Sequence, residues 1–352
     1  MKGKRQNREA SPAVDLMALA ECIEHFEDKR VVVLGDFVAD SFQIGDITRV
    51  SREAPVLILR HRQTEIVPGG GANAANNFAA LGASVIPISV VGDDAAGENL
   101  IAQFRAKNLN VSGILRVKDK ITPTKTRFLA GWTHTVAQQV LRVDYEPTAP
   151  LSESHFRKLQ SLAAAKIKSA DALAISDYGF GVVTPQMVRN LTSSLKRPIP
   201  VGLDSRYQLT AYRRAGITAA TPNEAELEAL HHISIGRDKS ALERCGHATL
   251  QHLKLGSLLV TRGKDGMALF EPGQPTVHIP VHGSDQAVDV TGAGDTVLAA
   301  YTLALASGAS AIEAAHIANI AGGLVVMKRG TATVTRGELL GAIRAAASET
   351  TS

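Results

Sequence analysis

The 352-residue chain is 45% hydrophobic but only 4% aromatic, and Ala, Val, Leu and Gly abound in it. This length allows one large domain or two ordinary ones, and the composition favours parallel strands covered by helices over an all-β sandwich. Of the formal net charge of +4, +3 lies within residues 1–10, so the body of the chain is almost neutral. Few aromatic residues and no basic run in the body argue against a nucleic-acid-binding protein.

The N-terminal segment carries basic residues but no apolar stretch behind them. Residues 1–20 are predicted to be a disordered basic tail, followed by a single domain over residues 21–352. No run reaches the roughly 18 uncharged apolar residues that a membrane-spanning helix needs. Cys22 and Cys245 are too few and too far apart for a disulfide framework and are predicted to be free thiols. We therefore expect a cytoplasmic protein without a membrane partner.

The first predicted strand covers residues 31–35, an apolar, β-branched run closed by Gly and Asp. It places Asp36 at the carboxyl end of a strand, where open α/β sheets bind ligands, although a solvated turn residue is an equal alternative. Strands are also predicted near 56–59, 125–130 and 138–144, with no long helices between them. These segments predict a small β lid formed from residues 40–60 and 120–145.

From residue 151 onward, helices and strands alternate regularly. Helices are predicted at 153–168 and 185–195, and strands at 172–176 and 199–203. A strand at 257–261, a hairpin at 266–280 and two or three final helices follow. The alternation predicts an α/β fold, in which helices flank a central, mostly parallel sheet and the small β lid is attached to it.

The most informative motif is Asp289-Val290-Thr291-Gly292-Ala293-Gly294-Asp295, which opens a predicted amphipathic helix. Small residues let backbone amides approach a ligand, and a helix N-terminus adds free N–H groups and a positive dipole end. Gly292, Ala293 and Gly294 therefore predict an anion hole, beside which Asp295 could take a proton from a hydroxyl during phosphoryl transfer. The alternative is that Asp295 merely occupies a first helical turn, where acidic residues are favoured.

Four motifs in order resemble the signatures of the ribokinase-like, or PfkB, carbohydrate kinases over roughly residues 31 to 340. They are Gly69-Gly70-Gly71-Ala72-Asn73-Ala74-Ala75-Asn76, Thr221-Pro222-Asn223-Glu224-Ala225-Glu226, Thr261-Arg262-Gly263-Lys264-Asp265-Gly266 and the motif that ends at Asp295. The resemblance implies a ribokinase-like fold and an ATP-dependent, magnesium-requiring kinase that acts on a small sugar or sugar phosphate. It also leaves room for a monovalent cation such as K⁺.

The resemblance also implies roles for individual residues. Asp295 would be the catalytic base, and Gly292, Ala293 and Gly294 would form the anion hole. The implied sugar contacts are Asp36, Asp40, Gly70, Gly71 and Asn73, and the implied nucleotide contacts are Asp204, Arg206, Asn223, Glu226, Thr261, Gly263, Gly266 and Asn319. Glu226 and Asn223 would hold Mg²⁺ through water, while Asp289 and Thr291 would lie near the monovalent cation. From the residues alone, Asn223 and Glu226 could equally form a helix capping box.

Within the family, the chain is most similar to kinases of D-glycero-D-manno-heptose 7-phosphate, which make the bisphosphate at the anomeric hydroxyl for lipopolysaccharide precursors. This similarity rests on residues 48–56, 124–127, 138–144, 176–178 and 328–334. Arg127 and Arg142 would hold the substrate phosphate, because arginine grips phosphate through two parallel N–H bonds. Solvent-facing arginines on a hairpin are the alternative.

Two positions depart from the heptose-kinase pattern, since Phe180 and Arg206 stand where those relatives carry lysines. Two alternatives therefore stay open: a PfkB-type kinase of another sugar or nucleoside, such as ribose, fructose or a hexose phosphate, and a catalytically weak sugar-binding regulator. An exposed sheet edge on the lid predicts a homodimer.

Two other patterns are set aside. Gly69, Gly71 and Ala74 have the spacing of a dinucleotide fingerprint, but Pro68 and the distance from the first strand spoil the required strand-turn-helix context. Cys245, His247 and His252 lack a fourth metal ligand and lie in a predicted helix.

Overall fold

The computed structural model describes residues 14–132, 137–284 and 286–350. Two sheets organise them. In spatial order, the larger sheet contains β13 (Val277–Ile279), β12 (Met267–Phe270), β11 (Ser257–Thr261), β10 (Ala219–Ala220), β9 (Val201–Ser205), β8 (Ala172–Asp177), β1 (Arg30–Gly35), β4 (Ser84–Gly92) and β5 (Ile114–Val117). Its neighbouring strands are parallel except for the β11–β12 and β12–β13 pairs, which are antiparallel. The predicted mostly parallel α/β sheet is confirmed.

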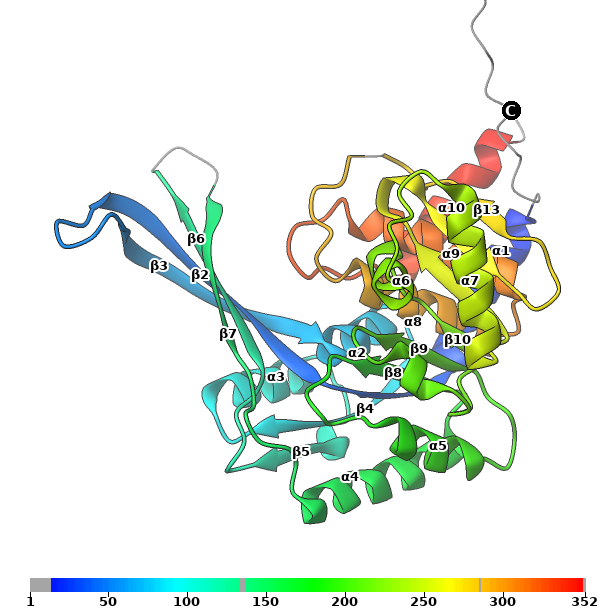
Figure 1. Cartoon of the computed structure of the whole chain (residues 1–352), viewed down its shortest axis with the longest axis horizontal. Helices are drawn as coiled ribbons and strands as arrows, with labels where there is room; N and C mark the ends of the chain where they lie inside the picture. Colours follow the sequence, from blue (N-terminus) through cyan, green and yellow to red (C-terminus); the bar gives the residue numbers. More distant parts are fainter. Residues whose placement is uncertain (1–13, 133–136, 285, 351–352) are drawn as a thin grey trace, which may run out of the picture.

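Helices cover both faces of this sheet (Figure 1). One face carries α1 (Leu16–Glu24), α2 (Gly71–Ala80), α3 (Ala95–Ala106), α8 (Ala293–Ala306), α9 (Ala311–Val325) and α10 (Arg336–Thr350), and the other carries α4 (Glu153–Lys166), α5 (Pro185–Ser193), α6 (Glu224–His231) and α7 (Lys239–Leu253). In β1, Val31 and Val33 join the first core while Val32 and Leu34 join the second. Burial on both faces explains the uninterrupted apolar run of this strand.

The smaller sheet is the lid, with the strand order β3 (Leu57–Gly70), β2 (Phe37–Val50), β6 (Thr124–Gly131) and β7 (Gln138–Tyr145). It projects from the main domain as a long arm (Figure 1). Strand β2 begins two residues after β1, and β3 runs directly into α2. The predicted strand near 56–59 was too short, because residues 60–65 are exposed and give no half-buried alternation to detect.

The predicted boundary of the N-terminal tail is wrong. Helix α1 begins at Leu16, with the Asp15 carboxylate accepting a hydrogen bond from the amide of Met17. It buries Leu19, Ala20 and Ile23, and it packs against α10. Residues 1–13 of the predicted tail lie outside the described residues.

Contrary to the expectation from the sequence, a strand does precede the helix that starts at Gly71. That strand is β3, which pairs antiparallel with β2 in the lid and is not part of a parallel βαβ unit. Cys245 and His247 lie within α7, as predicted, and both cysteines are free. In the described part of the chain, no set of three His, Cys, Asp or Glu side chains is arranged to hold a metal, and no helix could span a membrane.

Candidate active site

The site is built around the first turn of α8, which starts at Ala293 and buries Asp295. Gly292 caps this helix in the left-handed region, with φ of +77°. A Cβ atom at position 292 would lie 2.4 Å from the side-chain nitrogen of Asn73. Only glycine satisfies both the backbone angle and this close approach.

Asn73, in α2, fixes the orientation of Asp295. Its Nδ2 donates a 2.7 Å hydrogen bond to Oδ2 of Asp295, and both residues are buried. The amide of Asn77 donates in turn to Oδ1 and to the backbone carbonyl of Asn73, and the Thr296 hydroxyl donates to Asn77. The structure therefore joins Asn73 to the Asp295 carboxylate, and its contact with a sugar stays a prediction.

The Asp295 carboxylate is poised to accept a proton near neutral pH. Burial raises its pKa to about 7 and the nearby Asp40 adds to this, while the hydrogen bond from Asn73 and the charge of Lys125 oppose the rise. Its other oxygen, Oδ1, is buried and has no hydrogen-bond partner within the described residues. A base with a free oxygen and a pKa near the working pH suits proton abstraction from a hydroxyl.

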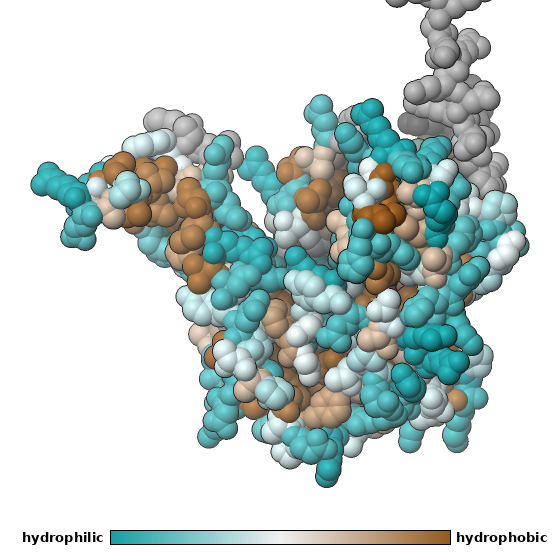
Figure 2. Space-filling model, viewed as in Figure 1, coloured by the Kyte–Doolittle hydropathy of each residue, from teal (hydrophilic) through white to brown (hydrophobic). Residues whose placement is uncertain are grey.

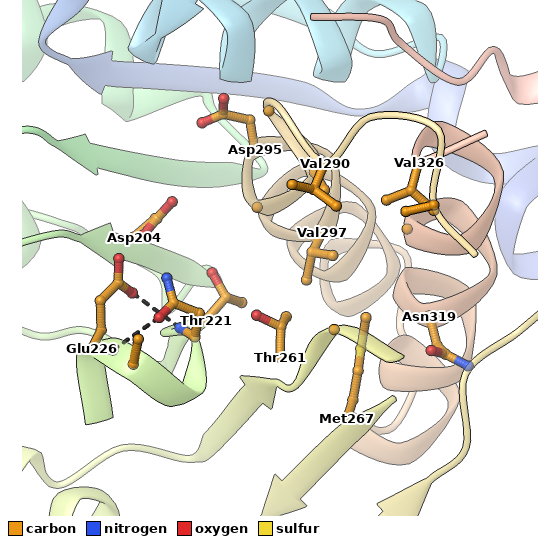
Figure 3. Close-up of a pocket in the computed structure, with 18 of the residues that line it drawn as sticks. Asp204, Thr221, Glu226, Thr261, Met267, Val290, Asp295, Val297, Asn319 and Val326 are labelled. Atoms are coloured by element: carbon orange, nitrogen blue, oxygen red, sulfur yellow. Dashed lines mark hydrogen bonds between the residues drawn. The ribbon is translucent and has the colours of Figure 1, made fainter. Parts of the chain in front are cut away.

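A cavity of about 800 Å³ lies against Asp295 and the N-terminus of α8. Figure 3 shows Asp295, Asp204 and Glu226 on one side of it, and Val290, Val297, Met267 and Val326 on the other. All the residues predicted to contact the nucleotide line it: Asp204, Arg206, Asn223, Glu226, Thr261, Gly263, Gly266 and Asn319. One end of the cavity is thus polar and acidic, and the other is apolar.

Asn223 and Glu226 form the capping box of α6. The Asn223 side chain accepts from the amide of Glu226 at 2.8 Å, and the Glu226 carboxylate accepts from the amide of Asn223 at 3.0 Å. Burial raises the pKa of Glu226. Burial, together with the charge of Glu226, raises the pKa of Asp204 well above its ordinary value. Two carboxylates that disfavour each other's charge in one cavity fit a divalent cation, which would relieve that repulsion.

One face of the lid presents charged side chains in two adjacent rows. Asp40 of β2 is level with Lys125 of β6, which is opposite Asp144 of β7. In the neighbouring row, Arg127 of β6 is opposite Arg142 of β7. The Arg127 guanidinium pairs with the buried Asp40 carboxylate at 2.5 Å, while Arg142 pairs with Asp144 at 2.5 Å. Arg127 is therefore paired with a carboxylate of its own chain, and its contact with a substrate phosphate stays a prediction.

Asp36 holds a loop. Its carboxylate accepts hydrogen bonds from the amides of Tyr178, Phe180 and Val182 at 2.9, 3.0 and 3.0 Å. The side chain is fully buried, and burial raises its pKa to about 6 against the effect of these amides. Both carboxylate oxygens thus hold the 178–182 loop, and the contact of Asp36 with a sugar stays a prediction.

The remaining predicted residues lie around the helix cap. The Asp289 carboxylate accepts from the amides of Thr291 and Gly330, each at 2.9 Å, and so ties two loops together. The Ala293 amide already donates to the carbonyl of Val290 at 3.2 Å, which leaves the amides of Gly292, Gly294 and Asp295 as the candidate anion donors. Gly70 and Gly71 join the lid to α2, where the Gly71 amide donates to the carbonyl of Asp36.

Comparison with known proteins identifies the family to which the chain belongs. The family model for pfkB family carbohydrate kinases matches residues 28–336. The chain belongs to the pfkB family of carbohydrate kinases. It is 38% identical over 321 residues to the bifunctional protein HldE of Geobacter metallireducens, and 38% identical over 313 residues to that of Geobacter sulfurreducens. These matches cover 91% and 89% of this chain but only 64% and 62% of the two relatives, so the chain spans less than two thirds of their length.

Solved pfkB-type kinases share the fold at lower identity. Escherichia coli phosphofructokinase-2 in complex with potassium superposes with a TM-score of 0.71 at 22% identity, covering 91% of this chain and 99% of that one. Arabidopsis thaliana ribokinase complexed with ribose and ATP gives a TM-score of 0.67 at 19% identity, covering 90% and 99% of the two chains. The predicted ribokinase-like fold is confirmed.

Two residues that line cavities of this pfkB kinase were not assigned from the sequence. Tyr178 is half-buried; desolvation, followed by the charges of Asp295, Asp204 and Asp40, raises its pKa. Lys125 lies with its ammonium 5.1 Å from the Tyr178 ring. The position of Lys125 two residues before Arg127 was a usable signal, since alternate residues of a strand share a face. For Tyr178 the signal was the stretch 176–178, which resembles the heptose-kinase pattern.

Proposed function

We propose that the chain is an ATP-dependent kinase whose catalytic base is Asp295. The observation that carries this proposal is the position of the Asp295 carboxylate. It is buried and lines the large cavity, burial raises its pKa to about 7, and its Oδ1 has no hydrogen-bond partner among the described residues. Family membership supports phosphoryl transfer to a carbohydrate hydroxyl.

ATP would occupy the 800 Å³ cavity. Its base would lie against the apolar residues Val290, Met267 and Val326, and its phosphates would extend toward Asp204, Glu226 and the N-terminus of α8 (Figure 3). Apolar cavities with a few convergent polar groups are typical of nucleotide and cofactor sites.

The reaction proposed here is an in-line displacement. Asp295 accepts the proton of the acceptor hydroxyl as its oxygen attacks the γ-phosphorus, and the bond to the β-phosphate oxygen breaks to release ADP. The amides of Gly294 and Asp295 and the positive end of the α8 dipole stabilise the negative charge of the transferring group. The lid covers the acceptor, which excludes water and limits ATP hydrolysis.

Magnesium is part of this proposal. Glu226 and Asn223 would hold it through water, with Asp204 on the same side of the cavity (Figure 3). When bound, the ion would spread the charge on the β- and γ-phosphates. For a monovalent cation such as K⁺, the proposed position is the loop that Asp289 and Thr291 form with Gly330.

The proposed acceptor is D-glycero-D-manno-heptose 7-phosphate, phosphorylated at its anomeric hydroxyl. The motifs that resemble heptose kinases support it, as does the 38% identity with HldE proteins over nine tenths of the chain. Asp40 is the side chain proposed to position a sugar hydroxyl, since it is buried next to the base on the lid face.

Self-association through the lid is also proposed, in a cytoplasmic enzyme with access to ATP. Figure 2 shows hydrophobic surface along the arm. Its exposed apolar residues are Val50, Val56, Leu57, Val140 and Leu141. An exposed apolar patch with open strand edges favours pairing with a second copy. A monomeric mass by light scattering at micromolar concentration would refute this assembly.

The deciding experiment measures ATP consumption with Mg²⁺ on four acceptors: D-glycero-D-manno-heptose 7-phosphate, ribose, fructose and fructose 6-phosphate. We expect turnover on the heptose phosphate, abolished in Asp295→Asn. Turnover on another sugar alone would refute the heptose phosphate as the acceptor but would still support the assignment as a sugar kinase. Saturable sugar binding with no turnover on any acceptor would favour the sugar-binding regulator.

A further inference from the structure

A second cavity, of about 530 Å³, adjoins the nucleotide cavity. The two share Tyr178, Arg206 and Tyr207 in their walls. The second cavity is enclosed by the lid strands, by the segment 146–150 and by the 178–182 loop that Asp36 holds. It is therefore a built pocket between lid and domain, on the acceptor side of the site.

Three cations line this cavity, Lys125, Arg142 and Arg206, together with two acidic residues, Asp144 and Glu146. Arg142 is paired with Asp144, whereas no ion pair to a described carboxylate is found for Lys125 or Arg206. Lys125 lies over the Tyr178 ring at 5.1 Å and Arg206 over the Tyr207 ring at 5.5 Å, so aromatic faces hold both side chains. Burial and the positive charges of Arg206 and Arg142 lower the pKa of Lys125, while the negative charges of Asp40 and Asp144 oppose this shift. The three cations are thus close enough to repel one another.

The three cations also lie near the proposed catalytic base, Asp295. Lys125 is level with Asp40 across the β2–β6 pair, and both act electrostatically on Asp295. An acceptor whose hydroxyl faces Asp295 and Asp40 would extend past Lys125 into the second cavity. Arg127 is not among the residues that line the second cavity. Its guanidinium is paired with Asp40, and only 15% of its side chain is exposed.

We infer that the second cavity binds a phosphate monoester carried by the acceptor sugar, with Lys125 and Arg206 as its ligands and Arg142 at the rim. The inference rests on the proposed sugar-kinase function and specifies which acceptors it takes. A phosphate monoester carries about −1.5 to −2 charges at pH 7, which offsets the repulsion among the three cations. Arginine adds paired N–H donors and lysine a compact charge, a combination suited to a terminal phosphate.

The test measures binding without turnover, in full-length Asp295→Asn protein without nucleotide. Calorimetry compares fructose 6-phosphate with fructose, and heptose 7-phosphate with the unphosphorylated heptose. We expect the phosphate to raise affinity at least about tenfold, as one charge-assisted contact can. Lys125→Met and Arg206→Met should abolish that preference, whereas Lys125→Arg should keep most of it. Arg62→Met removes an exposed lid cation that pairs with Asp46 and should change nothing.

Two results would overturn the inference. One is equal affinity for phosphorylated and unphosphorylated sugars, or a preference that survives in Lys125→Met and Arg206→Met. The other is a Lys125→Met variant that loses affinity for a non-hydrolysable ATP analogue but retains its affinity for the sugar phosphate. That result would show that the second cavity binds the nucleotide. Thermal unfolding of each variant verifies folding.

The same measurements test the phosphate site and the proposed acceptor independently of each other. Phosphate-dependent binding that requires Lys125, in a protein that does not turn over the heptose phosphate, supports the site and refutes the acceptor. Turnover of the heptose phosphate with binding insensitive to both substitutions supports the acceptor and refutes the site.

Discussion

Asn73 and Asp295 are 222 residues apart in the chain, and a 2.7 Å hydrogen bond from the Asn73 amide to Oδ2 joins them. This contact connects the N-terminal glycine-rich motif to the C-terminal one. It occupies one oxygen of the base and leaves the other, Oδ1, without a hydrogen-bond partner among described residues. The orientation of the base is therefore set by α2, the helix that continues from the lid.

The first prediction concerns pH. Because burial raises the pKa of Asp295 to about 7, we expect kcat/KM to rise with pH up to about 7 and then level, since only the ionised form accepts a proton. The Asn73 hydrogen bond opposes that rise in pKa. Asn73→Ala should therefore move the acidic limb to higher pH. A pH–rate profile from 5.5 to 9 measures both.

Thr296→Ala is the matched control for that experiment. It removes the hydrogen bond from Thr296 to Asn77 between the same two helices but leaves the carboxylate contact in place. Its acidic limb should coincide with that of the unaltered protein. An unchanged limb in Asn73→Ala would show that Asn73 does not tune the base.

The second prediction is that Asp295→Asn is inactive but more stable. The folded pKa of about 7 lies above the ordinary value of 3.8, so the free energy of unfolding falls as pH rises between these values, and the full loss of stability remains above pH 7. Asparagine lacks this cost. At pH 8 we expect a free energy of unfolding higher by roughly 1–3 kcal/mol, with activity lower by about 10²- to 10⁴-fold. Denaturant unfolding at pH 4 and 8 provides the comparison, and an equal gain at both pH values would contradict the explanation.

The third prediction concerns Asp36. Asparagine has one acceptor oxygen in place of two, so Asp36→Asn leaves at least one amide of the 178–182 loop unpaired, at a cost of roughly 1–3 kcal/mol. The loop should loosen and KM for the acceptor should rise more than KM for ATP. Asp171→Asn is the control, because Asp171 also accepts from a backbone amide, that of Arg30, but lies away from both cavities. Its KM values should stay unchanged.

The fourth prediction compares two glycines. Gly292→Ala would place a Cβ 2.4 Å from the Asn73 amide, so we expect loss of most activity. Gly308→Ala, at φ of +95° after the other end of α8, meets no atom within 4 Å and should cost only backbone strain of about 1–3 kcal/mol. Equal activity losses, measured with saturating ATP, would mean that strain and not collision with Asn73 is the cause.

The fifth prediction separates two roles of Glu226. Glu226→Gln retains a side chain able to complete the capping box, whereas Glu226→Ala does not. Both should weaken activation by Mg²⁺, but only the alanine variant should lower the melting temperature. If Glu226→Gln is activated by Mg²⁺ as well as the unaltered protein, Glu226 does not hold the ion.

The sequence predicted the parts of the fold whose signals are local. The run 31–35 is apolar because both faces of β1 are buried, and the helix-opening motif before Asp295 was visible as small residues in a row. The distal part of β3 was missed, since residues 60–65 are exposed and lack a two-residue pattern. The partners of Asp36, Asn73 and Arg127 could not be predicted, because each pairs with a residue more than 80 positions away.

The attachment of the lid has a consequence for engineering new acceptor specificity. Strand β2 starts directly after Asp36, and β3 ends at Gly70, where the Gly71 amide is hydrogen-bonded to the Asp36 carbonyl. A lid grafted from a relative therefore carries its junctions into the residues that hold the 178–182 loop and start the helix bearing Asn73. Chimeras joined beyond Phe37 and before Gly69 would exchange the sugar-facing surface as a cassette while the machinery around the base keeps its own alignment.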